Sequence, residues 1–161
     1  MSAELDRFDV KILQVLAEHG RVSWRELAER IGLSQTPTLR RVRALEAAGY
    51  IKGYHAQIDA NRLGQKLNVI VTVSLEEQTE EALGRFESRL QDFSEVMTCL
   101  MMSGDADYIL RIVVPDLDAY HAFLVEHLTR IPGVKKISSS FAIKSILQRT
   151  APPLRLGTTG R

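Results

Sequence analysis

The spacing of hydrophobic residues changes once along the chain, at Gly49, and this change constrains the fold more than any other feature. Before Gly49 the apolar residues recur three or four positions apart, which is the spacing of amphipathic helices. After it most of them alternate with period two, as in 67–75, which is the spacing of half-buried strands. A chain of 161 residues is long enough for two small domains. The sequence therefore predicts a helical domain followed by a domain built on a sheet.

Three short helices are predicted in the first fifty residues, each with signals for its start and end. Asp6 can cap the first helix, and Gly20 can end it. Ser23 and Glu26 form a capping-box pattern for the second helix, which Gly32 ends. The side chains expected to face the core are those of Leu5, Phe8, Ile12, Val15, Leu16, Trp24, Leu27, Ala28, Ile31, Leu39, Val42 and Leu45.

The segment 26–34 has the pattern of a helix-turn-helix. Ala28 is small enough for two helices to approach closely, Gly32 supplies the turn, and Leu33 fills the angle between the helices. Ser34 is placed to cap the third helix. In helix-turn-helix proteins the second helix of the motif enters the major groove of DNA, so the third helix of this chain is a candidate recognition helix.

The charge distribution supports a local DNA-binding patch and excludes a uniformly basic surface, because the formal net charge of the chain is only +1. Within 21–55, seven basic residues face three acidic ones. Thr36, Arg40 and Arg43 share the face of the third helix opposite its apolar stripe, where arginine can read guanine or hold phosphate. Lys52, on an expected strand over 50–59, is placed for a wing-like backbone contact. Alternatively, these arginines form only a solvated helix face.

The second half of the chain reads as strand, helix, strand, strand, helix, strand, which is the ferredoxin-like βαββαβ arrangement. The fold class is therefore α+β. The predicted elements lie near 67–75, 82–90, 95–102, 108–114, 117–131 and 134–146. The predicted domains are 1–50 for the helix-turn-helix domain, 51–66 for a linker strand or hinge, 67–150 for the ferredoxin-like domain and 151–161 for a flexible tail.

One face of the predicted sheet needs a cover, because both helices of this fold pack on the other face. Its candidate side chains are too apolar for a solvated face, which predicts that two sheets pair in a homodimer. The alternative is a face that is simply wet, as antiparallel sheets allow. The candidates are Ile70, Thr72, Met97, Cys99, Met101, Ile109 and Val113.

The turn 103–107 is a candidate site for a free amino acid. Asp105 or Asp107 can hold an α-ammonium group, and backbone N–H groups around Gly104 can hold an α-carboxylate. The neighbouring Leu100 and Met102 can receive an apolar side chain. The alternatives are a plain turn, in which aspartate serves only local hydrogen bonds, or a metal site, which lacks a third ligand in the sequence.

Other classes of protein have less support. The apolar stretch 67–75 is too short to span a bilayer as a helix. The single cysteine and the absence of a signal-peptide pattern predict a cytoplasmic protein. We expect no catalytic residues, metal or cofactor, since the four histidines form no ligand cluster and no nucleophile motif or phosphate loop occurs. A small ferredoxin-like dimeric enzyme and an amino-acid sensor without DNA function remain the alternatives.

The order and spacing of several short motifs resemble the leucine-responsive regulatory protein/AsnC family, the feast/famine transcription regulators of bacteria. The resemblance covers about residues 4 to 154. The motifs are Leu5-Asp6-Arg7-Phe8-Asp9, Gly20-Arg21-Val22-Ser23, Glu26-Leu27-Ala28, Gly32-Leu33-Ser34, Arg40-Arg41-Val42, Gly49-Tyr50-Ile51-Lys52-Gly53-Tyr54, Ser103-Gly104-Asp105, Asp107-Tyr108 and Ile131-Pro132-Gly133-Val134.

This resemblance implies a winged helix-turn-helix DNA-binding domain and a ferredoxin-like effector domain. It also implies homodimers that assemble further, with an octamer expected and an amino acid bound between dimers. The DNA contacts it implies are Ser34, Gln35, Thr36, Pro37, Thr38, Arg40, Arg41 and Arg43. The effector contacts it implies are Leu100, Met102, Ser103, Gly104, Asp105 and Asp107 at the turn and Ser140, Phe141, Ala142 and Ile143 on the last strand. The sequence after Ser139 resembles local regulators of the family more than the global leucine regulator.

Overall fold

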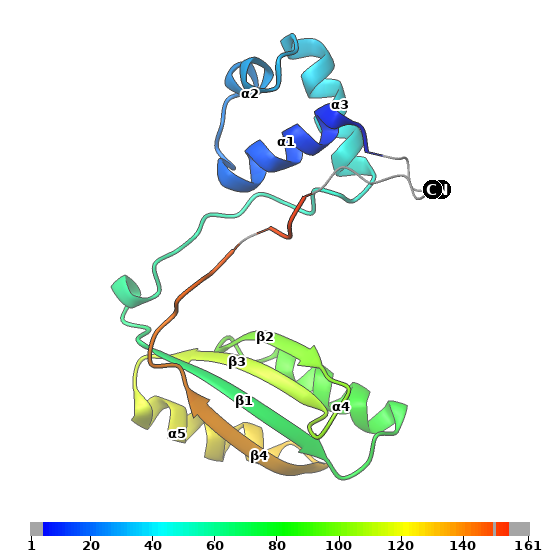
Figure 1. Ribbon diagram of the computed structural model, residues 1–161. Coiled ribbons are helices and arrows are strands. Elements are labelled where there is room, and N and C mark those ends of the chain that lie inside the picture. Colours follow the sequence, from blue (N-terminus) through cyan, green and yellow to red (C-terminus); the bar gives the residue numbers. More distant parts are fainter. Residues whose placement is uncertain (1–4, 150, 155–161) are drawn as a thin grey trace. The chain divides into compact units, whose positions relative to one another are not determined.

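The computed structural model describes residues 5–149 and 151–154, which divide into two compact units (Figure 1). One unit runs to Ile58 and also takes in the segment from Leu147, and the other is Asp59–Ile146. The division falls inside the predicted linker 51–66. Most of the predicted flexible tail 151–161 lies outside the described residues.

The first unit contains the three predicted helices. The first begins with a full capping box, in which the Asp6 carboxylate accepts from the N–H groups of Phe8 and Asp9 and the Asp9 carboxylate accepts from the N–H of Asp6. The helices enclose a small apolar core, whose fully buried members are Ile12, Leu27, Ile31, Val42 and Leu45. The helices are α1 (Arg7–Glu18), α2 (Trp24–Ile31) and α3 (Gln35–Ala47).

The turn between α2 and α3 has the predicted construction. Gly32 is left-handed at φ 78°, a conformation that glycine adopts without strain. The N–H groups of Gly32 and Leu33 both donate to the carbonyl of Ala28, which closes α2. Leu33 packs against the core of the unit, so it fills the angle between the helices as predicted.

Four predictions about this unit were wrong in detail. Trp24 is not in the core, since 38% of it is exposed. Ser34 has the backbone conformation of a cap but makes no capping hydrogen bond through its side chain. Thr38, and not Leu39, continues the buried stripe of α3, because its hydroxyl donates to the Ser34 carbonyl at 2.8 Å and is thereby satisfied inside. No strand forms over 50–59, because the described part of this unit offers no second strand for it to pair with.

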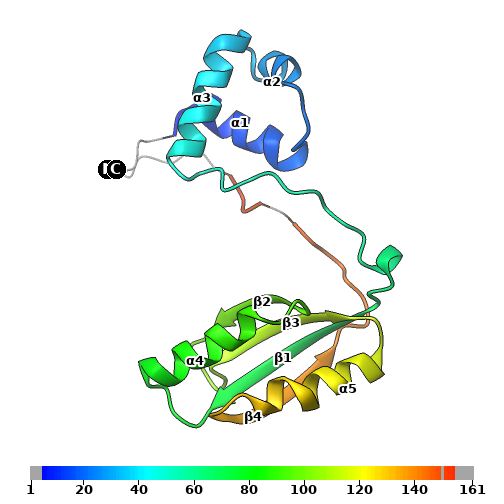
Figure 2. The same ribbon diagram turned by 180° about the vertical axis from the view of Figure 1, so that it is seen from behind.

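The second unit is a four-stranded antiparallel sheet in the order β2-β3-β1-β4, with two helices on one face (Figures 1 and 2). This is the predicted ferredoxin-like fold. Its elements are β1 (Leu67–Leu75), α4 (Glu80–Gln91), β2 (Val96–Met101), β3 (Tyr108–Val114), α5 (Leu117–Glu126) and β4 (Val134–Phe141), with short 3₁₀ turns at Asn61–Leu63 and Leu128–Arg130.

The core of this unit lies between the sheet and its two helices. Alternate residues of β1 and β3 are fully buried there, and each contributes about 1.5–3 kcal/mol by leaving water. β4 ends at Phe141 instead of the predicted 146, because the N–H of Ala142 makes the last bond to β1, at the Asn68 carbonyl. β1 begins one residue earlier, so nothing remains for a longer β4 to pair with.

A register shift between Val96 and Thr98 changes which side chains of β2 face outward. Beyond this shift, Cys99 lies opposite the buried Leu110, on the helix side of the sheet, and Leu100 lies on the outer side. Such a bulge inverts the alternation that a sequence pattern assumes. The assignment of Cys99 and Met101 to the outer face was therefore wrong, since they lie opposite the buried Leu110 and Tyr108 on the helix side. Met97 lies in the bulge itself and has no paired residue on β3, whereas Ile70, Thr72, Ile109 and Val113 lie on the outer face.

Candidate nucleic-acid interface and effector site

The outward face of α3 forms a surface hollow of about 350 Å³. Gln35, Thr36, Leu39, Arg40 and Arg43 line it. Helical spacing brings them together, because positions three or four apart lie on one face. Sequence reasoning missed Leu39, which it placed in the core. The buried residues of α3 are Thr38, Val42 and Leu45, spaced four and then three apart. This helical spacing was the signal that could have put Leu39 on the outward face.

Two arginines on this face differ from those of α2 in having no acidic partner among the residues that the structure describes. Arg25 and Arg30 each pair with a glutamate on α2, at 3.1 and 2.7 Å. Arg40 and Arg43 are exposed and have no ion pair within the described residues. Because no carboxylate of the described chain neutralises them, these two guanidinium groups are available to an external anion.

Two of the predicted contact residues on α3 point elsewhere. Thr38 is buried. The Arg41 guanidinium lies against α1, where one of its nitrogens, Nη1, is 2.8 Å from a carboxylate oxygen of Asp6 and 2.8 Å from one of Asp9. Only 28% of the Arg41 side chain is exposed. The structure therefore removes both residues from the outward surface of the helix.

The segment after α3 is held against the end of that helix. The N–H of Ile51 donates to the Leu45 carbonyl, and the Ile51 side chain packs on the core. The Tyr54 hydroxyl donates to the Glu46 carboxylate at 2.9 Å. Lys52 lies between these two attachments and is exposed, so its ammonium group is presented beside α3 although it is not on a strand.

The turn 103–107 is tied to the end of β1. The Asp107 carboxylate accepts from the N–H of Leu75 at 2.7 Å and from the Gln78 side chain at 3.3 Å, and the Ser74 hydroxyl donates to the Asp105 carbonyl. Both Asp107 oxygens therefore have partners inside the chain. The Asp105 carboxylate has no hydrogen bond or ion pair to any described residue, so of the two candidates it is the one open to an ammonium group.

The last-strand segment 140–143 lies at the opposite end of β1 from this turn. Ser140 faces outward opposite Ile70, Phe141 packs edge-on against Tyr120, and the N–H of Ala142 bonds to Asn68. Seven residues of strand separate Asn68 from Leu75, which is about 23 Å at 3.3 Å per residue. The structure therefore does not bring the two predicted parts of the effector site together within one chain. Ile143 is fully exposed.

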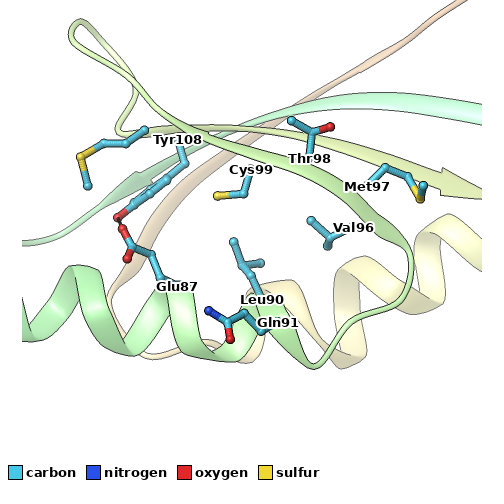
Figure 3. Close-up of a pocket in the computed structure, with 9 residues that line it drawn as sticks. Glu87, Leu90, Gln91, Val96, Met97, Thr98, Cys99 and Tyr108 are labelled. Carbon is cyan, nitrogen blue, oxygen red and sulfur yellow. Dashed lines mark hydrogen bonds between the residues drawn. The ribbon is translucent and has the colours of Figure 1, made fainter. Parts of the chain in front are cut away.

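A cavity of about 370 Å³ lies between α4 and β2 (Figure 3). Figure 3 shows Tyr108 pointing toward Glu87, whose carboxylate accepts from the phenol at 2.8 Å. Burial, together with the hydrogen bond and charge of Glu87, raises the pKa of Tyr108. Burial and the charge of Glu87 also raise the pKa of the Cys99 thiol, which keeps it protonated and makes it a poor nucleophile.

The described ranges hold neither a metal-ligand cluster nor a membrane-spanning helix. No three His, Cys, Asp or Glu side chains lie together as metal ligands within 5–149 and 151–154. Likewise, none of the helices in those ranges is long and apolar enough to cross a bilayer. His127 packs against the rings of Phe93 and Phe123, an aromatic contact of the core.

Comparisons with known proteins match both units. A family model described as winged helix-turn-helix DNA-binding matches residues 5–52, and one described as the Lrp/AsnC ligand binding domain matches residues 68–152. The Bkd operon transcriptional regulator of Pseudomonas aeruginosa is 59% identical over 94% of this chain and 99% of its own. The leucine-responsive regulatory protein of Escherichia coli K12 is 39% identical over 90% of this chain and 88% of its own.

Solved structures agree with these matches over nearly the whole chain. A transcriptional regulator from Neisseria meningitidis, solved as an L-methionine complex, has a TM-score of 0.89 and 36% identity and covers 93% of this chain and 97% of its own. An AsnC family transcriptional regulator from Agrobacterium tumefaciens has a TM-score of 0.88 and 38% identity with the same coverage.

Proposed function

We propose that this chain, a member of the Lrp/AsnC family of transcriptional regulators, binds specific sequences of double-stranded DNA through α3. We also propose that it responds to a free amino acid. Like its relatives, the chain is a transcriptional regulator and not an enzyme. The observation that carries the DNA contact is the pair of exposed arginines on α3, Arg40 and Arg43, which have no ion pair among the described residues.

The proposed DNA contacts divide by chemistry. Arg40 and Arg43 project from the middle of α3 and are placed to meet base edges or phosphates in the major groove. The first turn of α3 offers the N–H groups of Gln35 and Thr36, which bond to no described residue, and the Ser34 hydroxyl, which suit a phosphate. Lys52 is placed for the flanking backbone. The proposed set is Ser34, Gln35, Thr36, Pro37, Arg40, Arg43 and Lys52.

The test is the salt dependence of binding to duplex DNA. Each phosphate contact that is lost should reduce the slope of log K against log salt by about 0.9. We expect Arg40→Ala and Arg43→Ala to weaken binding, by about 1–3 kcal/mol where the arginine reads a base. Arg85→Ala, which removes an exposed helix arginine from the other unit, is the matched control. Unchanged affinity in both α3 variants, with the wild-type slope, would contradict the proposal and favour a sensor without DNA function.

The proposed effector is a free amino acid whose ammonium group meets Asp105, while Asp107 holds the turn in place. Because Asp107 and Ala142 bond to residues of β1 that are about 23 Å apart, we propose that each bound molecule contacts the turn of one chain and the last strand of another. The proposed contacts are Leu100, Met102, Ser103, Gly104, Asp105, Asp107, Ser140, Phe141, Ala142 and Ile143.

The proposed assembly is a homodimer that pairs the outer sheet faces, with further association to an octamer. The outer face carries Ile70, Ile109 and Val113, and burying such side chains is the driving force for association. The effector acts through unequal affinity for two assemblies, since a ligand shifts an equilibrium only by that difference. We place the protein in the bacterial cytoplasm, where its DNA partner lies. Light scattering with and without effector tests the assembly.

A thermal-shift screen of the twenty amino acids tests the effector. L-methionine and L-leucine come first, because a relative was solved with the former and other relatives are named for the latter. A ligand at one hundred times its Kd stabilises the folded protein by about 2.7 kcal/mol. A shift caused by one amino acid or a small chemical group of them supports the proposal. The same melting temperature with all twenty would contradict it.

A further inference from the structure

The run Arg40-Arg41-Val42-Arg43 contains three arginines, and they have different surroundings. Arg40 and Arg43 are exposed on the hollow of α3. Arg41 reaches α1 instead, where its Nη1 is 2.8 Å from both Asp6 and Asp9. Its guanidinium carbon also lies 5.4 Å from the centre of the Phe8 ring, within range of a cation–π contact.

We infer that Arg41 is a positioning residue for DNA recognition: it fixes the rotation of α3 against α1 so that Arg40 and Arg43 point at the duplex, and it does not contact DNA itself. This inference rests on the proposed function of α3. Helical spacing leaves Arg41 off the face that Arg40 and Arg43 share, but no local pattern in the sequence indicates that it reaches α1.

The two acceptors of Arg41 are themselves fixed. One oxygen of the Asp6 carboxylate accepts from the backbone at the start of α1, and the other meets Arg41. Asp9 divides its two oxygens in the same way, between the N–H of Asp6 and Arg41. The capping box therefore orders both carboxylates independently of Arg41, so the ion pairs cost little further side-chain entropy at Asp6 and Asp9.

The geometry of a helix converts this attachment into an orientation. Successive residues are about 100° apart around the axis. With Arg41 directed at α1, Arg40 lies about 100° to one side and Arg43 about 160° away in the same direction, so the two point together, away from α1. The five buried side chains of the core do not fix this angle as sharply, because hydrophobic contact is not directional.

The experiment measures the affinity of the full chain for two duplexes of equal length, one selected by the wild-type protein from random-sequence DNA and one of random sequence. We expect Arg41→Gln to lower affinity for the selected duplex at least tenfold while affinity for the random duplex changes less than twofold. The salt slope on random DNA should stay at the wild-type value, because no phosphate contact is lost. Arg41→Lys should recover part of the loss, since one nitrogen serves both carboxylates.

Asp9→Asn separates positioning from DNA contact most clearly. Removing an acid should raise DNA affinity if only long-range electrostatics act. Positioning through Arg41 predicts the opposite, a loss of affinity for the selected duplex, and the double variant Asp9→Asn/Arg41→Gln should be little worse than either single variant. Glu18→Gln, which removes an exposed acid at the other end of α1, is the control for charge.

The inference is overturned if Arg41→Gln reduces the salt slope on random DNA, or if Asp9→Asn binds the selected duplex as well as or better than the wild type. These results leave the proposed function intact as long as Arg40→Ala and Arg43→Ala still weaken binding. If Arg41→Gln does not fold, as circular dichroism would show, Asp9→Asn and Arg41→Lys decide the question.

Discussion

The proposed effector site makes a prediction that a site within a single chain cannot share. Asp107 of the turn bonds to Leu75 and Ala142 of the last segment bonds to Asn68, at opposite ends of β1 and about 23 Å apart. A free amino acid has one residue of backbone, about 3.5 Å, and one side chain, so it cannot bridge this distance. If both regions bind the same molecule, they belong to different chains.

Two variants that each lack one region should therefore restore binding when they are mixed. Asp105→Ala removes the open carboxylate of the turn, and Ile143→Glu places a charge in the exposed last-strand segment. Each alone should bind no effector. In an equal mixture of randomly assembled chains, half of the turns and half of the segments are wild type, so about one quarter of the intermolecular sites are complete.

Isothermal titration calorimetry of the co-assembled mixture measures this fraction as a stoichiometry. Asp105→Ala mixed with Met102→Glu is the matched control, because both changes lie at the turn and every site in that mixture is defective. Light scattering confirms that the chains assemble as in the wild type. An Asp105→Ala and Ile143→Glu mixture that binds no better than its separate components would refute the intermolecular site.

Three further predictions concern stability. Gly32→Ala should destabilise the first unit by about 1–2 kcal/mol, the cost of a left-handed alanine, whereas Gly84→Ala, inside α4 with no atom near its added methyl group, should stabilise the second unit by about 0.5–1 kcal/mol. Thermal melts measure both. Burial, and then the hydrogen bond and charge of Glu46, raise the pKa of Tyr54 to about 12. The stabilisation of the fold by the protonated Tyr54 is therefore complete below its unfolded pKa of about 10 and is lost as pH rises through 12. An ultraviolet titration of wild type against Tyr54→Phe should show one phenol that titrates late. The N–H of Asp9, and after it the N–H of Phe8 and the Arg41 guanidinium, lower the pKa of Asp6, whereas burial opposes them. The loss of stability caused by Asp6→Ala, about 1 kcal/mol at neutral pH, should therefore disappear in acid denaturation as pH falls below about 4.

Periodicity and end signals predicted which elements form, because both are local properties of the chain. The capping aspartate of α1, the Gly32 turn and the alternation of β1 each depend on a few neighbouring residues, and all are present. The strand over 50–59 was predicted from the same kind of signal and is absent. A strand needs a partner, and no local pattern states whether the partner is in the same chain.

Register and pairing could not be predicted, because they depend on residues far apart in sequence. The bulge after Val96 turned Cys99 to the helix side of the sheet, and only its alignment with Leu110 reveals this. The attachment of Arg41 to Asp9 spans 32 residues. A helical wheel put Arg40 and Arg43 on the basic face of α3, and the family resemblance added Arg41 to the DNA contacts without indicating what it touches.

The same limit applies to the effector site. The family resemblance implied an amino acid bound between dimers, but it did not state that the turn and the last strand of one chain are too far apart to share a ligand. In this fold β1 is antiparallel to both β3 and β4, so the start of β3 and the end of β4 must lie at opposite ends of the sheet. Any ligand that contacts both therefore joins two copies of the chain. If one effector molecule contacts both regions, effector binding and assembly are linked, and the effector should strengthen association by the same factor by which association strengthens effector affinity.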